Sequence, residues 1–432
     1  MAAKRKDVTP ARRAAFEILR RVAGGAFSSV LLATEEPNLK PADRALCHEL
    51  VLGVLRWQRF LDKIVEHSAK RNVESLDLPV RIALRLGLYQ LRFLSRIPAA
   101  AAVNESVTLV RSAKLSSAAA FVNAVLRRAI READYDPTTE IHDPLDKIAI
   151  ATSHPRWLID RWANSFGLAE AESFARSNND IPPTAFRVVH TRVAEDEVLR
   201  NLSEAGASTE PSKIAQNAFR VSGAAAVLRN LSSAGQIYLQ DEASQLVPQL
   251  LNLQPGQRAL DLCAAPGGKT TLLADRANDK AFVVAADRSA TRLTTVTTTT
   301  SLHQLRNINP LLLDANHQLP FASATFDRVL VDAPCSGTGT LRRNPEIRWR
   351  LTNDDIQNYA TAQTQFLRHA ANVLRPGGQL VYSTCSVERE ENEHVVENFL
   401  ETTPGFILLK TLRTWPHREG SDGFFMALLE NK

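Results

Sequence analysis

The sequence lacks the features that mark several large classes of protein. No apolar run approaches the ~18 residues that a membrane-spanning helix needs, and the basic start MAAKRKDVTPARRAAFEIL carries charges where a signal peptide has an apolar centre. The four cysteines lie far apart without a C-x-x-C pair, and the ten histidines show no metal-ligand spacing. A membrane span, a disulfide framework and a zinc knuckle are therefore not indicated. We expect a cytoplasmic protein without a bound metal.

Acidic residues are scarce at one end of the chain. Residues 1–130 hold 22 Lys and Arg against 11 Asp and Glu, a net charge of +11, whereas the remainder holds 30 against 36, a net of −6. The overall charge of +5 is thus a property of the N-terminal region. A basic module of this kind favours nucleic acid as partner. The alternative is a well-solvated helical surface.

Periodicity divides the chain into three predicted domains. Residues 1–140 are expected to form an all-α bundle, because segments such as PARRAAFEILRRV carry apolar residues at i, i+3, i+4 and i+7. The acidic stretch DYDPTTEIHDPLD looks like a linker. Residues 141–234 mix helix-like and strand-like runs and predict a small α+β connector. Residues 235–432 alternate strands with helices, which predicts a Rossmann-like α/β domain with a mostly parallel sheet.

Six acids and thiols follow the five strands predicted in the last domain. They are Asp261, Asp287, Asp314, Asp332, Cys335 and Cys385. Ligands of parallel sheets bind beyond the carboxyl ends of the strands, where these side chains gather. A lone cysteine at a strand end is usually a packing residue, and we interpret Cys47 and Cys263 in that way. Two thiols together with four acids predict an active site instead.

The stretch DLCAAPGGKTT, residues 261–271, is a predicted ligand loop. Pro266, Gly267 and Gly268 favour a tight turn whose backbone can approach a ligand, and the helix that follows presents its N-terminal amides to an anion. The loop lacks both the G-x-G-x-x-G pattern and the P-loop spacing, which weakens nicotinamide and nucleoside triphosphate interpretations. Asp287 stands where doubly wound folds bind ribose hydroxyls. An adenosine ligand with a carboxylate fits, and S-adenosylmethionine is such a ligand.

A methyl donor beside two thiols suggests one reaction. Carbon 5 of cytosine is a poor nucleophile, but a thiolate that adds at carbon 6 converts the ring into an enamine whose carbon 5 can attack a methyl group. Loss of the carbon 5 proton and expulsion of the thiolate then require a second group. An acid such as Asp332 can stabilise the adduct through the N3 and amine edge of the ring. On this reasoning either cysteine can be the nucleophile.

Several motifs carry a resemblance to a known family. DLCAAPGGKTT, DAPCSGTG and STCS, with EREENEHVVENFL and DGFFMALL, resemble the RNA cytosine-C5 methyltransferases of the Sun/Nop family. AAVNESVTL and FVNAVLRR resemble the NusB-type RNA-binding domain. The resemblance spans nearly the whole chain. It implies an enzyme that uses S-adenosylmethionine to methylate ribosomal RNA, in particular 16S rRNA. We expect a monomer that acts on naked RNA or on a partly assembled small subunit, with no DNA substrate.

The resemblance also implies a role for each site residue. Cys385 would be the nucleophile, Cys335 the helper that releases product, and Asp332 a contact to cofactor and target base. Asp287 would bind the ribose of the cofactor and Asp314 its adenine. The methionine part would contact Cys263, Ala264, Ala265, Pro266, Gly267, Gly268, Lys269 and Thr270. One departure is RLTTVTTTTSLHQL, a threonine run of poor helix propensity where the family has a charged helix.

Other interpretations stay open on the sequence alone. The chain can be an inactive RNA-binding or assembly factor, although intact acids and thiols argue against it. It can also be a DNA cytosine-C5 methyltransferase, in which Cys335, following a proline, would be the nucleophile. LRRNPEIRWR, residues 341–350, has four arginines and a tryptophan, which favours phosphate contacts and base stacking. YLQDEASQL, residues 238–246, is expected either to position RNA or to cap a helix.

Overall fold

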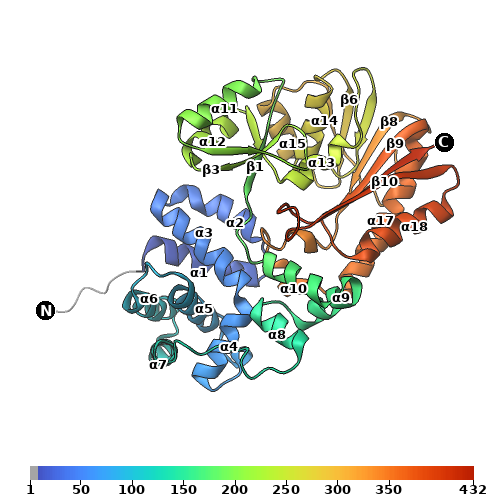
Figure 1. Cartoon of the computed structure of the whole chain (residues 1–432). Coiled ribbons are helices and arrows are strands. Elements are labelled where there is room, and N and C mark those ends of the chain that lie inside the picture. Colours follow the sequence, from blue (N-terminus) through green and yellow to red (C-terminus); the bar gives the residue numbers. More distant parts are fainter. Residues whose placement is uncertain (1–7) are drawn as a thin grey trace. The chain divides into compact units, whose positions relative to one another are not determined.

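The structure is a computed structural model that describes residues 8–432. Residues 1–7, part of the basic start, lie outside the described residues. The chain divides into two compact units (Figure 1). One holds the residues up to Asp180 together with Leu341–Arg350, and the other holds Ile181–Thr340 and Leu351–Lys432. Among the described residues, no helix combines the length and apolarity that a membrane crossing requires.

The first unit is helical, as the periodicity predicts. Its helices are α1 (Pro10–Ala23), α2 (Ser28–Glu35), α3 (Pro41–Arg56), α4 (Gln58–Ala69), α5 (Leu78–Phe93), α6 (Ala99–Ser112), α7 (Ala119–Arg131), α8 (Pro144–Ala151), α9 (Arg156–Phe166) and α10 (Leu168–Ser177). Apolar faces of α1 to α7 bury one continuous core that includes Leu50, Leu84 and Leu126. The predicted linker is shorter than expected. Its last residues enter α8, because the Asp143 side chain accepts a hydrogen bond from the Asp146 amide and caps that helix.

The segment Leu341–Arg350 packs within the first unit, although it follows the DAPCSGTG loop in the chain. Arg348 is 0% exposed and donates to the carbonyl oxygens of Ser153 and Asn178 at 3.1 and 3.2 Å. The Trp349 indole donates to the Leu55 carbonyl at 2.8 Å. The Arg350 guanidinium donates likewise to main-chain carbonyls between α1 and α2.

These contacts correct the prediction of phosphate binding and base stacking for Arg348, Trp349 and Arg350. Burial, aided by the charge of Arg56, lowers the pKa of Arg348 to about 9, as expected for a guanidinium removed from water. Carbonyl oxygens of the helical unit take the hydrogen bonds that RNA phosphates were expected to take. Composition alone does not separate the two partners, because a carbonyl and a phosphate oxygen both accept from arginine.

The second unit begins with a small antiparallel sheet. Its strands are β1 (Thr184–Val188), β2 (Ser208–Pro211), β3 (Ala218–Ser222) and β4 (Ile237–Leu239), in the order β2-β3-β1-β4. Helices α11 (Glu195–Glu204) and α12 (Ala225–Ser233) bury a core with it around Phe186 and Phe219. The buried Arg187 donates to the Thr271 hydroxyl at 2.8 Å, which fastens this sheet to the helix of the predicted ligand loop. The predicted α+β connector therefore places its helices α8 to α10 in one unit and its sheet in the other.

A seven-stranded sheet forms the body of the second unit, in the order β10-β11-β9-β8-β5-β6-β7. The strands are β5 (Arg258–Asp261), β6 (Phe282–Asp287), β7 (Ile308–Leu312), β8 (Phe326–Asp332), β9 (Leu374–Thr384), β10 (Phe406–Thr414) and β11 (Phe424–Asn431). Strands β5 to β9 pair in parallel, whereas β11 is antiparallel to β9 and β10 is antiparallel to β11. The five parallel strands match the prediction. The antiparallel pair at the edge was not predicted.

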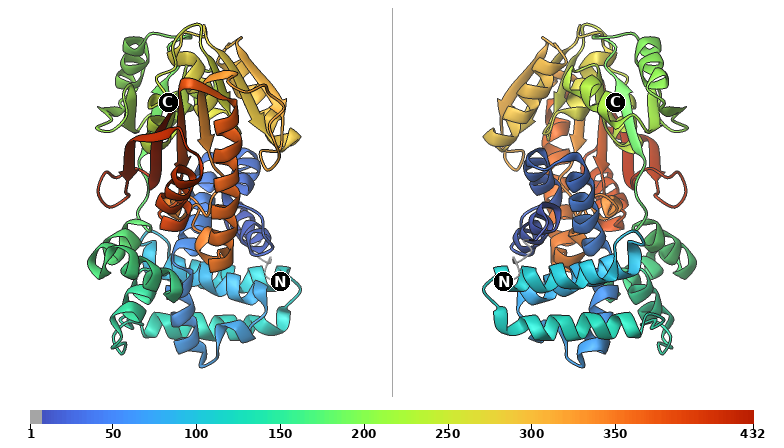
Figure 2. Two further views of the ribbon diagram at one scale, coloured as in Figure 1. Left: turned by 90° about the vertical axis from the view of Figure 1, so that its right-hand side faces the viewer. Right: turned by 90° about the vertical axis from the view of Figure 1, so that its left-hand side faces the viewer.

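Helices cover both faces of this sheet (Figure 2). One face packs on α17 (Asn353–Val373) and α18 (Glu393–Thr402), and the other on α13 (Glu242–Gln249), α14 (Gly268–Arg276) and α15 (Ala290–Leu302). Successive residues of a strand point to opposite faces, so Leu260 belongs to the first core and Ala259 to the second. A strand buried on both faces explains the continuous apolar runs in the sequence.

The threonine run forms a regular helix, α15, despite its poor propensity. The hydroxyls of Thr294, Thr297 and Thr298 donate to main-chain carbonyls four residues earlier, which satisfies them within the helix. Val296 is buried in the core beneath α14. Tertiary packing thus outweighs the low helix propensity of threonine. The predicted strands on either side of α15 still form.

Candidate functional site

The parallel strands carry the predicted site residues to one edge of the large sheet. Asp261 ends β5, Asp287 ends β6 and Asp332 ends β8. Asp314 follows β7 by two residues, and Cys385 directly follows β9. Strand β5 lies between β6 and β8, where the chain changes direction along the sheet and a crevice opens in doubly wound folds.

The predicted ligand loop is a tight turn between β5 and α14. Gly267 has φ +103°, and a Cβ there would lie 3.2 Å from the Val296 Cα, so the turn requires glycine. The Thr270 hydroxyl donates to Asp261 Oδ2 at 2.6 Å. Helix α14 begins at Gly268, so its first amides face the strand ends.

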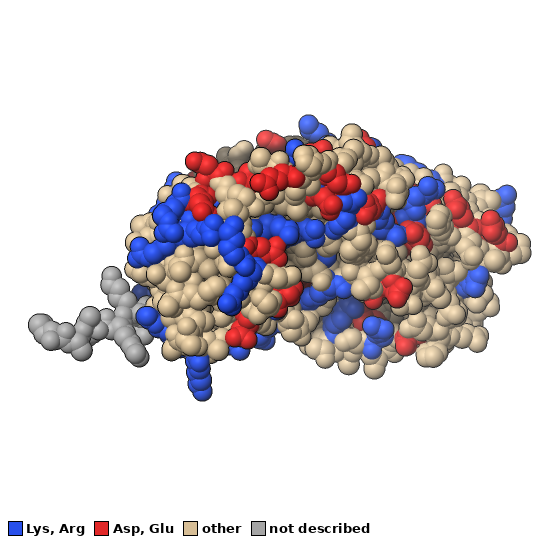
Figure 3. All heavy atoms as spheres, turned by 90° about the horizontal axis from the view of Figure 1, so that it is seen from below, with Lys and Arg blue, Asp and Glu red and all other residues tan. Residues whose placement is uncertain are grey.

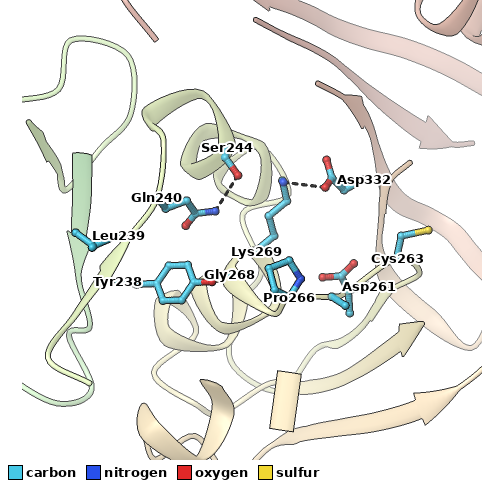
Figure 4. Close-up of a pocket in the computed structure, with 12 residues that line it drawn as sticks. Tyr238, Leu239, Gln240, Ser244, Asp261, Cys263, Pro266, Gly268, Lys269 and Asp332 are labelled. Atoms are coloured by element: carbon cyan, nitrogen blue, oxygen red, sulfur yellow. Dashed lines mark hydrogen bonds and ion pairs between the residues drawn. The ribbon is translucent and has the colours of Figure 1, made fainter. Parts of the chain in front are cut away.

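A cavity of about 220 Å³ opens beside this loop (Figure 4). Lys269 extends across it, and its Nζ lies 2.8 Å from Asp332 Oδ2. The Asp332 carboxylate also accepts from the Ser383 hydroxyl at 2.7 Å, across the β8–β9 pair. Asp261 Oδ1 is buried in the wall and has no partner among the described residues. The cavity therefore combines an ammonium, two carboxylates and an unused acceptor.

Electrostatics keep Lys269 charged. Burial works to lower the pKa of this ammonium, but the charge and hydrogen bond of Asp332, with smaller contributions from Cys385 and Asp261, raise it above its ordinary value. The pKa of Asp261 rises to about 7, chiefly through burial, while the Thr270 hydrogen bond opposes the shift. Asp261 consequently changes its charge near neutral pH.

Asp261→Asn is expected to remove a pH dependence of stability. The folded chain holds a proton on Asp261 up to about pH 7, whereas the unfolded chain releases it near the ordinary value of 3.8. The folded state binds more protons in that window, so this group lowers the free energy of unfolding as pH rises from about 4 to 7, by about 1.4 kcal/mol for each pH unit. Urea denaturation at pH 5 and pH 8 should show the variant gaining stability relative to wild type at the higher pH. If the difference in free energy of unfolding between variant and wild type is the same at pH 5 and pH 8, the raised pKa assigned to Asp261 is wrong.

A second cavity, of about 110 Å³, shares the loop residue Cys263 with the first. Leu313 and Phe366 supply apolar walls, and Asp287 and Asp314 contribute carboxylates. Asp287 Oδ1 accepts from the Ser289 amide, and Asp314 Oδ1 accepts from the Asn316 amide and side chain. Apolar walls with a few convergent acceptors suit a ligand with a flat ring and hydroxyl groups.

The two strand-end thiols meet at the same edge. The sulfur atoms of Cys335 and Cys385 lie 3.4 Å apart. Their loops pack closely, because the Gly339 amide donates to the Cys385 carbonyl at 2.9 Å and a Cβ at Gly339 would lie 2.9 Å from the same oxygen. The hydrogen bond with Cys385, followed by burial, raises the pKa of the Cys335 thiol. The structure thus brings together the two cysteines singled out in the sequence.

Cys47 is the matched contrast, since it is 0% exposed in the helical core. Burial and the nearby acids Glu36, Glu35 and Asp43 raise its pKa to about 12. We expect iodoacetamide at pH 8 to modify Cys385 at least tenfold faster than Cys47, because a reactive thiol must be exposed and ionised. Peptide mass spectrometry measures both rates, with urea-unfolded protein as the control in which they converge. Comparable rates in the folded protein would contradict this placement.

The segment Tyr238–Leu246 caps a helix, which is one of the two uses expected for it, and the other use, positioning RNA, stays a prediction. Asp241 caps α13 by accepting from the Ala243 amide at 2.9 Å. Tyr238 and Gln240 line the first cavity instead, and the Gln240 amide nitrogen donates to the Ser244 hydroxyl. Gln240 carried no signal beyond its position in this motif.

Glu391 was not predicted as a site residue. Its carboxylate accepts hydrogen bonds from Ser336 and Ser386, the residues that follow the two thiols in the chain. The signal was weak, because EREENEHVVENFL offers several acids and Ser336 lies 55 residues away. Only the meeting of the two loops distinguishes Glu391 from its neighbours.

Three protein-family models match successive parts of the chain. Residues 9–131 match the NusB family, residues 154–228 match the ferredoxin-like domain of RsmF/B-like methyltransferases, and residues 248–430 match 16S rRNA methyltransferase RsmB/F. The order and extents follow the helical bundle, the connector and the large sheet domain. The predicted fold class, with a NusB-like bundle, an α+β connector and a Rossmann-like methyltransferase domain, is confirmed.

Relatives resemble the chain over its full length. The probable ribosomal RNA small subunit methyltransferase B of Synechocystis sp. is 34% identical over 446 residues, covering 97% of this chain and 99% of its own. Ribosomal RNA small subunit methyltransferase B of Pseudomonas putida is 35% identical over 98% of both chains. The crystal structure of PH0851 has a TM-score of 0.85 and 28% identity, covering 99% of this chain and 100% of that one. The chain therefore belongs to the RsmB/F family of 16S rRNA methyltransferases, enzymes that use S-adenosylmethionine as methyl donor.

Proposed function

We propose that this enzyme methylates carbon 5 of one cytosine in 16S rRNA through a covalent bond between Cys385 and carbon 6 of the ring. The observation that carries the proposal is the pair of sulfur atoms 3.4 Å apart, at the strand ends beside the Lys269–Asp332 ion pair. Methylation of an oxygen or of an exocyclic amine needs no thiol, whereas an unactivated ring carbon does.

Charge supports Cys385 as the nucleophile. Cys385 is one of the groups that raise the pKa of the Lys269 ammonium, after Asp332, so this sulfur lies near a positive charge. Cys335 faces the Glu391 carboxylate instead, and its own pKa is raised. The thiolate at Cys385 adds to carbon 6, N3 takes up a proton, and carbon 5 becomes an enamine carbon that can attack a methyl group.

The Lys269–Asp332 pair supports cytosine as the target. An ammonium and a carboxylate side by side present a donor next to an acceptor. Cytosine offers the matching pattern, an acceptor at N3 and a donor at N4, whereas uracil offers the reverse. Asp332 would hold the exocyclic amine and Lys269 would assist protonation at N3. The base must leave its stack to reach this cavity.

S-adenosylmethionine supplies an electrophilic methyl group when bound, and the residues present fit it. The second cavity combines apolar walls with Asp287, which would hold the ribose hydroxyls, and Asp314, which would hold the adenine. The loop from Cys263 to Thr270 would bind the methionine part. The orphaned, buried Asp261 Oδ1 is an acceptor suited to an ammonium group.

Release of the product follows from the coupling of the thiols. The hydrogen bond with Cys385 is the largest cause of the raised Cys335 pKa. Once Cys385 is bonded to carbon 6 it no longer makes that hydrogen bond, and Cys335 ionises more readily. Its thiolate then takes the carbon 5 proton, the electron pair restores the C5–C6 double bond, and Cys385 leaves as a thiolate. N3 returns the proton that it took up, so the product is neutral.

The helical unit is proposed to hold the RNA. Figure 3 shows Lys and Arg gathered in a band on one face, with acidic residues interspersed. Exposed basic residues of this unit include Lys70, Arg71, Arg111, Lys114, Arg127 and Arg131. We propose domain boundaries at residues 140 and 234, a monomer, and naked or partly assembled small-subunit RNA as substrate.

The function is tested by incubating the enzyme with labelled S-adenosylmethionine and unmodified 16S rRNA, followed by nucleoside mass spectrometry. We expect 5-methylcytidine, and a stalled covalent complex on RNA that contains 5-azacytidine. Trapping on DNA but not on RNA would replace the proposal by a DNA methyltransferase. Absence of any transfer to free rRNA and to assembling subunits would favour an inactive assembly factor.

A further inference from the structure

Glu391 is a buried carboxylate that the proposed reaction does not use, and it is 0% exposed. Its Oε1 accepts from the Ser336 amide at 2.7 Å, and its Oε2 accepts from the hydroxyls of both Ser336 and Ser386. Ser336 directly follows Cys335, and Ser386 directly follows Cys385. One carboxylate therefore bridges the two loops that carry the thiols.

The bridge is a costly way to join two loops. Gln363 adds a donor at 3.3 Å, but across residues 8–432 no Lys or Arg pairs with Glu391. Burial raises the pKa of this carboxyl, while the hydrogen bonds from Ser336 and Ser386 oppose the shift. A buried charge without a counter-ion is unfavourable, and apolar side chains would connect the loops at lower cost. The presence of a carboxylate here, where apolar side chains would cost less, indicates that Glu391 acts on the thiols.

A second set of contacts fixes the same loop to β9. The Asn392 amide nitrogen donates to the Ser386 carbonyl at 3.0 Å, and its oxygen accepts from the Thr384 hydroxyl. The Tyr382 hydroxyl donates to the Glu391 carbonyl. Residues on both sides of the second thiol are therefore tied to the Glu391 turn, which leaves that sulfur little freedom to move.

The charges around the thiols are unequal. Glu391 contributes to the raised pKa of Cys335, whereas Lys269 lies near Cys385. Tyr359 and Tyr382 also interact with Cys335, and both are neutral near pH 7, since burial raises their pKa values. The neighbouring negative charge of Glu391 thus acts on Cys335, whereas the neighbouring positive charge of Lys269 acts on Cys385.

We propose that Glu391 is a positioning residue that holds the two thiol loops at one separation and keeps the proton on Cys335, which leaves Cys385 as the nucleophile. The inference rests on the proposed function for its purpose, since the nucleophile and the releasing group must differ in charge before the base arrives. Its geometry is independent of RNA and of the methyl donor, which allows a test without either.

Phenylarsine oxide tests the separation, because one arsenic atom bonds two adjacent sulfur atoms and its oxygen leaves as water with the two thiol protons. We expect Glu391→Ala to weaken binding of this probe at least tenfold, with Glu391→Gln within about twofold of wild type because an amide can still bond both serines. Glu393→Ala is the matched control, since this carboxylate lies two residues away and pairs with Arg413. Thermal melting establishes that each variant is folded.

Alkylation tests the proton. The rate of Cys335 modification by iodoacetamide is followed by peptide mass spectrometry from pH 7 to pH 11.5, a range extended upward because the pKa of this thiol is raised. It should show a midpoint at least half a pH unit lower in Glu391→Gln than in wild type. A role limited to structure would leave this midpoint unchanged. Glu393→Gln, which alters charge outside the site, should match wild type.

The proposal is overturned if folded Glu391→Ala binds the arsenical as tightly as wild type, or if Glu391→Gln leaves the Cys335 midpoint in place. Should Glu391→Ala fail to fold, Ser386→Ala takes its place and is expected to weaken arsenical binding, with unchanged binding counting against the bridge. A chain that passes both tests yet forms no 5-methylcytidine would refute the proposed function while leaving the positioning role intact.

Discussion

Cys385→Ala is expected to abolish both methyl transfer and covalent RNA complexes, whereas Cys335→Ala is expected to form complexes that fail to dissociate. The first variant removes the sulfur proposed to bond carbon 6. The second keeps that sulfur and loses the group proposed to take the carbon 5 proton, so the reaction stops after methylation. Because the two sulfur atoms lie 3.4 Å apart, one can bond the base and the other can take the proton without movement of either loop.

A denaturing gel with labelled rRNA and a methyl-transfer assay measure the two outcomes together. Cys47→Ala is the control, because this thiol lies in the helical core, and it should retain wild-type transfer. If Cys335→Ala instead abolishes the complexes and Cys385→Ala accumulates them, the roles are exchanged. Equal loss of complexes in both variants would show that the sulfur atoms act as one unit.

Lys269→Met and Asp332→Asn are each expected to lower kcat by roughly 10²- to 10³-fold, the usual scale for removing one charged group that stabilises a transition state. The ion pair of 2.8 Å faces the cavity proposed for the base, where it would favour protonation of the adduct. The two losses should not add, because each substitution leaves the other residue without its partner.

Single-turnover methylation by both variants and by the double variant measures this coupling. Lys280→Met provides the control, since Lys280 is exposed on the same unit and is expected to leave the rate unchanged. A change confined to KM would show that the pair binds RNA without taking part in the chemistry. Additive losses would show that Lys269 and Asp332 act independently.

Local patterns in the chain already contain much of this site. Apolar runs that end in acids identify the parallel strands, and parallel strands deliver their carboxyl ends to a single edge, so Asp261, Asp287 and Asp332 can be grouped from the amino-acid sequence. The helical period likewise identifies the N-terminal bundle. The strand and helix assignments can be made locally, because the spacing of apolar residues along the sequence matches the repeat of the backbone in each element.

Long-range packing decides what those patterns leave out. Leu341–Arg350 looks suited to RNA by composition, yet Arg348 and Trp349 donate to carbonyls that lie 195 and 294 residues earlier in the chain. Glu391 reaches Ser336 from 55 residues further on. Strand β11 pairs with β9 and β10 pairs with β11, through register contacts that carry only a weak local signal.

Periodicity and motif spacing alone determine that this chain has a helical module, an α/β domain, and acids and thiols at one sheet edge, because strand and helix periods are local properties. Only the tertiary structure decides that Cys335 and Cys385 come within 3.4 Å, that Lys269 pairs with Asp332, and that one buried carboxylate bridges both thiol loops. Those distances depend on how separate loops pack against each other, and hydrogen bonding and burial set that packing once the strands have assembled.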